Sequence, residues 1–280
     1  MGFLVQLITW VNVVTNAIGG FFLAPVASVP GWLSITVISA VLGVFLLVIF
    51  KYTSNQKAIG YVRDDIKANL LAVKLFKDSF SVTFRSQARV FCASFKLLFY
   101  SIVPMLVMIV PVILIMAQMS LWYQARPLLP GDEPVIVRLK LNDNLDTLPQ
   151  VFLESLPAAR TMVGPVRVFT KKEIFWKIKP VEDGNYNLIF HIGDRRYEKQ
   201  LAVGEGFMRL SPKRPGADFA DILLYPLEKP FTSDSLVHSI SINYPERDSR
   251  INGTDWWIVY FFVVSMIFAF MFKPFLKVRI

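Results

Sequence analysis

The chain contains three long apolar runs that are almost free of polar side chains, at 32–50, 97–119 and 256–273. Lys273, at the very end of the third run, is their only charged residue. A bilayer core about 30 Å thick is crossed by roughly 20 apolar residues at 1.5 Å each. The pattern therefore predicts three transmembrane helices, and the alternative of three buried helices in a soluble fold is much less typical of such runs.

The first 31 residues carry a different pattern. Between 3 and 18, Gln6, Thr9, Asn12 and Asn16 fall on one helical face, and apolar residues occupy the opposite face. This pattern predicts an external interfacial amphipathic helix over 1–31. An ordinary helix packed beside the spans fits the pattern equally well.

Residues 51–96 show helical periodicity in two stretches separated by Asp78 and Ser79. Apolar residues recur at steps of three and four in each stretch, which predicts an antiparallel helical hairpin with its two stripes facing each other. The stripes consist of Ile59, Val62, Ile66, Leu70 and Val73, and of Phe80, Phe84, Ala88, Phe91 and Phe95.

Residues 120–255 alternate between apolar and polar in several short runs, which predicts a separate all-β domain between the second and third spans. A turn at 183–185 precedes Tyr186, and this turn-plus-tyrosine pattern resembles that of immunoglobulin-like sandwiches. An ordinary core aromatic is the simpler interpretation of Tyr186. The expected strands lie at 135–141, 166–169, 173–179, 187–192, 197–203 and 237–242.

The formal net charge is +9, and the excess of basic residues is confined to two segments. Residues 51–96 hold nine bases and three acids, residues 97–255 are balanced, and the last eight residues add three bases. Short basic loops stay in the cytoplasm, so the hairpin and the 274–280 tail are expected there. The N-terminus and the β domain then lie outside, as in a multi-pass protein of the inner (plasma) membrane.

The hairpin bases have three possible roles. They can meet anionic lipid headgroups, contact the phosphates of ribosomal RNA, or serve only to fix topology. The candidate contact residues are Lys51, Gln56, Arg63, Lys67, Lys74, Lys77, Arg85 and Arg89.

Signals for catalysis are nearly absent from the sequence. Cys92 is the single cysteine, and neither His191 nor His238 has neighbours in sequence that would complete a metal site. Phosphate-binding glycine loops and nucleophile elbows do not occur. We therefore expect neither an enzyme nor a cofactor, a metal or DNA as a ligand.

The second apolar run carries unusual residues for a simple anchor. Pro104 and Pro111 interrupt its backbone hydrogen bonding, and methionines occur at 105, 108, 116 and 119. Flexible methionine side chains can line a groove that accepts varied apolar shapes. Methionines that merely face lipid or fill gaps between helices are the alternative.

The order of segments resembles the YidC/Oxa superfamily of membrane-protein insertases, in particular its small three-span branch of archaeal YidC-like proteins and their endoplasmic-reticulum relatives. The resemblance rests on Phe50–Gln56, which leaves the first span, and on Val103–Leu106, which enters the second. It covers about 32–119 and 256–276, less than half of the chain.

The resemblance implies a lipid-exposed groove between the spans, open to the cytosol, that receives hydrophobic segments of nascent membrane proteins. The hairpin would contact the client or the ribosome. A membrane-anchored scaffold, whose β domain binds an envelope protein, is the alternative function. Hydroxyl groups of the groove could also simply bond to carbonyls of their own helix. The groove candidates are Thr36, Ser39, Ser101, Met105, Met108 and Ser265.

Overall fold

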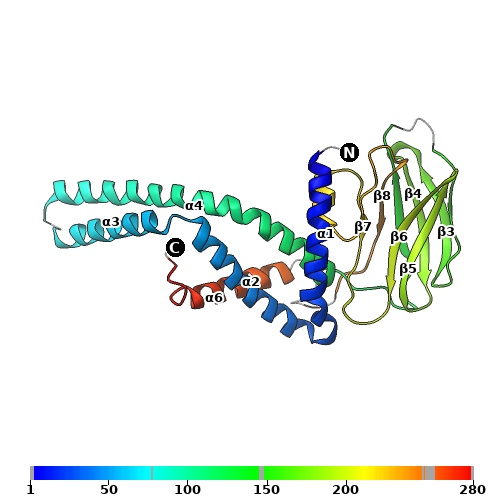
Figure 1. The fold of residues 1–280 in the computed structure, drawn as a ribbon, viewed down its shortest axis with the longest axis horizontal. Coiled ribbons are helices and arrows are strands. Elements are labelled where there is room, and N and C mark those ends of the chain that lie inside the picture. The colour runs from blue at the N-terminus through cyan, green and yellow to red at the C-terminus, as the bar shows by residue number, and fades with distance from the viewer. Residues whose placement is uncertain (1–2, 77, 145–147, 248, 250–255, 279–280) are drawn as a thin grey trace. The chain divides into compact units, whose positions relative to one another are not determined.

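The computed structural model describes the chain except residues 1–2, 77, 145–147, 248, 250–255 and 279–280. The chain forms two compact units (Figure 1). The helical unit comprises 36–113 and 260–280, and the β unit comprises 1–35 and 114–259.

The helical unit is built from parts of four helices, of which α4 is by far the longest. The helix α4 runs without a break over 44 residues and contains Pro104 and Pro111. The second arm of the predicted hairpin and the second predicted span are therefore one helix, with no turn near residue 96. The helices are α2 (Gly31–Thr53), α3 (Gln56–Leu75), α4 (Phe80–Tyr123) and α6 (Trp256–Phe272).

The segment after the first apolar run is a helix-to-helix turn. The side chain of Asn55 caps α3 by accepting a hydrogen bond of 3.0 Å from the Ala58 N–H. The Gln56 amide in turn donates to the Ser54 hydroxyl. The polar residues in Phe50–Gln56 thus end one helix and begin the next.

The hairpin is present as α3 and the first part of α4. Its second apolar stripe, however, is exposed, whereas the prediction placed this stripe against the first one. Figure 1 shows α3 running back along the first part of α4. The buried residues of this part of α4 are small, namely Ser86 and Ala93, whereas Phe80 is 85% exposed and Phe84 67% exposed. Small side chains thus occupy the buried positions, and the bulky aromatic face lies outside. The whole predicted stripe of Phe80, Phe84, Ala88, Phe91 and Phe95 is exposed.

Among the residues that the structure describes, three helical stretches are long and apolar enough to cross a membrane, namely Val5–Ser28, Gly31–Thr53 and Phe80–Tyr123. Two of them contain predicted spans. The third predicted span is α6, whose 17 residues lie at the short end of the roughly 17–25 that a crossing requires. The N-terminal stretch meets the same criterion of length and composition as the two predicted spans.

The β unit contains two antiparallel sheets. Five strands follow the order β3-β4-β1-β8-β7, and three follow the order β2-β5-β6. A short helix, α5 (Phe219–Leu224), precedes the last strand. The strands are β1 (Val135–Leu141), β2 (Val151–Leu153), β3 (Ala159–Val168), β4 (Glu173–Pro180), β5 (Gly184–Ile192), β6 (Arg195–Val203), β7 (Lys213–Arg214) and β8 (Val237–Ile242).

A single hydrophobic core joins the two sheets. Ile174, Trp176 and Ile178 alternate along β4 and are buried, as the sequence alternation predicts. The Trp176 ring meets Phe190 of the other sheet edge-on at 5.2 Å between centroids. Tyr186 is only half-buried, so its interpretation as a core aromatic is wrong. Its hydroxyl donates to the Asp183 carbonyl at 3.0 Å.

The N-terminal helix α1 (Phe3–Leu23) belongs to the β unit. Two side chains of its polar face are tied to the segment around α5. Asn12 Nδ2 donates to the Ile222 carbonyl at 2.7 Å, and Asn16 Nδ2 donates to the Pro226 carbonyl at 2.6 Å. Trp10, on the opposite face, is 67% exposed. The amide groups of Asn12 and Asn16 thus bind the protein through their Nδ2 atoms, while Trp10 on the other face is exposed.

Candidate functional site

Within the helical unit, α2 and α6 cross at a glycine. A Cβ atom placed on Gly43 would lie 2.3 Å from the Ser265 carbonyl oxygen and 2.8 Å from its Cα. Because glycine has no side chain, the backbones of α2 and α6 can approach each other this closely. Toward the N-terminus of α2, the Thr36 and Tyr260 hydroxyls form a further link between the two helices, with 2.7 Å between their oxygens.

An apolar cavity of about 220 Å³ opens beside this crossing. Its walls come from three helices, and its only polar side chain is that of Ser265. The residues that α2 contributes lie in its C-terminal half, toward Lys51. The lining consists of Gly43, Leu46, Leu47, Phe50, Met108, Ser265, Met266, Ala269 and Phe270.

Two of the six predicted groove residues, Met108 and Ser265, line this cavity. Of the other four, Thr36 bonds to Tyr260, and Ser39 is fully buried. Met105 is 59% exposed and does not line the cavity. The cavity therefore brings together only two of the six predicted groove residues.

The hydroxyl groups are largely engaged by their own helices. Ser101 Oγ donates to the Leu97 carbonyl at 2.9 Å, and Ser265 Oγ donates to the Phe262 carbonyl at 3.0 Å. Such bonds satisfy a hydroxyl in an apolar surrounding without water. For these two serines, the alternative of local carbonyl bonding is correct, and the cavity wall is chemically apolar.

The prediction missed most of the lining. Gly43, Leu46, Leu47 and Phe50 follow the i, i+3, i+4, i+7 spacing of one helical face, as the sequence could have revealed. The residues between these positions are apolar too, however, so the sequence does not distinguish this face from the other faces of α2. The other missed residues are Met266, Ala269 and Phe270.

The predicted contact residues of the hairpin lie close to the end of α2 or along the two hairpin helices. Lys51 sits in the last turn of α2, where its charge favours the helix C-terminus. Lys67 is exposed and lies 3.9 Å from Asp64, a pair worth little in water. Lys77 lies outside the described residues. Lys74, Arg85 and Arg89 are exposed, and Lys51, Gln56 and Arg63 are half-buried.

Within the described part of the β unit, one group of potential metal ligands comes together that the sequence did not reveal. Ligand atoms of Asp218, Asp221 and His238 lie within 4.8 Å of one another. Asp221 already faces the Lys213 ammonium at 2.5 Å, and His238 Nε2 lies 3.1 Å from Asp218. A lysine charge thus occupies the place that a cation would take, and the group is best described as an ion-pair network.

Comparison of the chain with known protein families, with curated proteins and with solved structures found no match.

Proposed function

We propose that this protein is an integral membrane protein that acts as a YidC/Oxa-like insertase or membrane chaperone. The helices α2, α4 and α6 cross the bilayer in this proposal, and the cavity beside Gly43 receives apolar side chains of a client segment. The observation that carries the proposal is an apolar cavity with two methionines, Met108 and Met266, at the Lys51 side of three apolar helices.

The size of the cavity suits this use. Small-molecule sites typically enclose roughly 300–1,000 Å³. A volume of about 220 Å³ suits one or two apolar side chains that project from a client helix. Methionine walls adapt to different side-chain shapes, which a chaperone of varied clients requires.

The charge distribution supports an orientation for the proposed crossing. The bases of 51–96 and of the C-terminal tail lie on the same side in a three-span topology, which the positive-inside rule places in the cytoplasm. The cavity then lies in the cytoplasmic half of the bilayer, where a nascent segment arrives. The β unit lies outside.

Photo-crosslinking tests the proposal at paired positions. A photoreactive residue at Met108 lines the cavity, and one at Val110, two residues later on α4, lies about 200° around the helix and is 62% exposed. We expect arrested nascent chains of single-span, short-tailed membrane proteins to crosslink to position 108 several-fold more than to position 110. Depletion of the protein should slow insertion of the same clients.

Equal crosslinking at the two positions would identify ordinary contact with lipid-embedded neighbours and refute a client site in the cavity. Normal insertion after depletion would refute the insertase function, even if crosslinks form. Fusion of a reporter to the C-terminus tests the orientation separately, since the proposal requires that end in the cytoplasm.

A further inference from the structure

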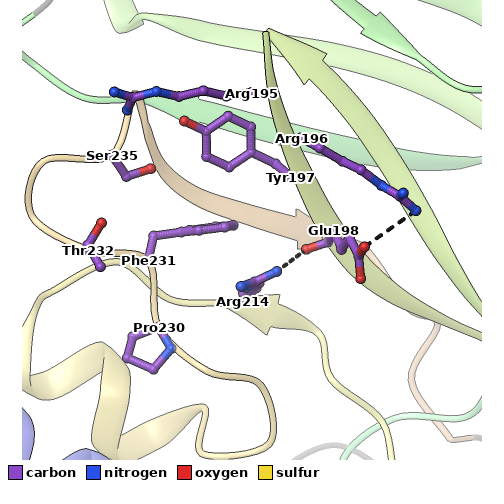
Figure 2. A pocket seen from close by; sticks show the side chains of 9 residues that line it. All are labelled: Arg195, Arg196, Tyr197, Glu198, Arg214, Pro230, Phe231, Thr232 and Ser235. Atoms are coloured by element: carbon purple, nitrogen blue, oxygen red, sulfur yellow. Dashed lines mark hydrogen bonds and ion pairs between the residues drawn. The ribbon is translucent and has the colours of Figure 1, made fainter.

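The β unit has a second concave surface, which the insertase proposal does not use. A notch of about 550 Å³ lies between the first half of β6 and the segment 230–235. Figure 2 shows Tyr197 and Glu198 of β6 on one side and Phe231, Thr232 and Ser235 on the other. Arg195, Arg196, Arg214 and Pro230 complete its lining.

The strand β6 is an edge strand of the three-stranded sheet, and most of its outward backbone groups are capped. The Ala202 N–H donates to the Tyr244 hydroxyl at 2.9 Å, and the Ala202 carbonyl accepts from the Leu128 N–H at 3.3 Å. The Gln200 N–H donates to a Glu228 carboxylate oxygen at 3.1 Å. Such capping prevents an edge from pairing with another chain.

Two more outward groups of β6, the carbonyls of Gln200 and Glu198, are also capped, and the capping then stops at the notch. Lys199 Nζ donates to the Gln200 carbonyl at 3.1 Å, and Arg214 Nη1 donates to the Glu198 carbonyl at 2.5 Å. Backbone groups of alternate residues point to the same side of a strand, so the N–H of Glu198 and both backbone groups of Arg196 also point outward. Among the described residues, none of these three groups has a partner, and all three border the notch.

The notch is rich in positive charge. Three arginines line it against one acid, Glu198, and Arg196 lies 3.4 Å from that carboxylate. The Arg214 guanidinium is held 4.3 Å from the Phe231 ring centre, which fixes it at one end of the notch. Arginine forks match carboxylates in geometry as well as in charge.

We propose that the notch binds an extended acidic peptide segment of a second protein, which adds to the open part of β6 as a further strand. Backbone bonds to Arg196 and to the Glu198 N–H would hold the segment, as in other cases of strand addition. Carboxylate side chains on one face of the segment would meet either Arg195 or Arg196, which are neighbours in sequence and project to opposite faces of the strand. The inference does not depend on the insertase proposal.

Fluorescence anisotropy with the full chain in a nonionic detergent tests this proposal. The probe is a fluorescein-labelled peptide of alternating glutamate and valine, eight residues long. We expect saturable binding that weakens roughly tenfold or more in the double variant Arg195→Ala with Arg196→Ala, because charge-assisted hydrogen bonds are lost. Arg160→Ala is the matched control, since Arg160 is an exposed arginine on β3, the edge strand of the other sheet.

Two further peptides separate strand addition from plain charge attraction. A peptide with the same glutamates but with prolines in place of the central valines cannot donate the required backbone bonds. It should bind much more weakly, and a lysine–valine peptide should not bind. Equal binding of the proline peptide, equal binding by the double variant, or no binding of the acidic probe would each overturn the proposal. In the last case, the arginines serve only to guard the edge.

Discussion

Replacing Gly43 with alanine is expected to push α2 and α6 apart. The new Cβ would lie 2.3 Å from the Ser265 carbonyl oxygen, whereas ordinary contact begins near 3.4 Å. The obstacle is backbone, so it cannot rotate away, and the two helices must separate by about 1 Å. Overpacking of this kind costs about 1–3 kcal/mol. A β-branched residue is larger, so Gly43→Ile should cost more than Gly43→Ala.

Thermal unfolding in detergent, followed by circular dichroism at 222 nm, measures this effect. At roughly 2–4 °C per kcal/mol for a chain of this size class, the alanine variant should lose about 2–12 °C. Val41→Ile is the control, because Val41 lies on the same helix and is 62% exposed. If Gly43→Ile unfolds at the same temperature as this control, α2 and α6 do not cross closely at Gly43, and the proposed cavity loses one wall.

Three other predictions concern the β unit. The fully buried Lys199 ammonium lies 2.5 Å from the Glu228 carboxylate, and Glu228→Gln removes this counter-charge. Urea denaturation followed by tryptophan fluorescence should show a loss of about 3–5 kcal/mol in the free energy of unfolding. A loss below about 1 kcal/mol would contradict the buried pair. The hydrogen bond from Arg126 holds the pKa of Asp132 below its usual value, so Asp132→Asn should cost about 1 kcal/mol at pH 7. The difference from wild type in unfolding free energy should disappear as the pH falls below the lowered pKa. Asn12→Ala removes a buried bond of 2.7 Å to α5, and hydrogen exchange in α1 should accelerate while exchange in β5 stays unchanged.

The apolar runs and the β alternation were readable from the sequence because each is a strong local signal. Runs of uncharged residues mark helices whatever their neighbours, and β1 and most of β4 bury every second residue, whereas β3 is exposed along most of its length. The short strands β2 and β7 were missed, since three and two residues are too few to show a period. Confirmation covers the helices and the sheets, whereas the crossing of the bilayer remains a prediction.

Other features depend on contacts between distant segments. Both faces of the first part of α4 contain plausible interface residues, and only the partner α3 decides that Ser86 and Ala93 turn inward. Likewise, a side chain at position 43 is excluded by the backbone of Ser265, which lies more than 200 residues away in the sequence. Polar residues of α1 were visible as a face, but their bonds to the α5 segment depend on how the β unit folds.

The continuity of α4 gives the hairpin a mechanical role. From Phe80 to Met108 the helix extends about 42 Å as one rod, so a load applied at the hairpin end tilts the cavity wall at the other end. Pro104 lacks the N–H that would bond to the preceding turn, and bending therefore concentrates four residues before Met108. Under the proposed function, a client or ribosome bound at the hairpin would therefore tilt the cavity wall at Met108.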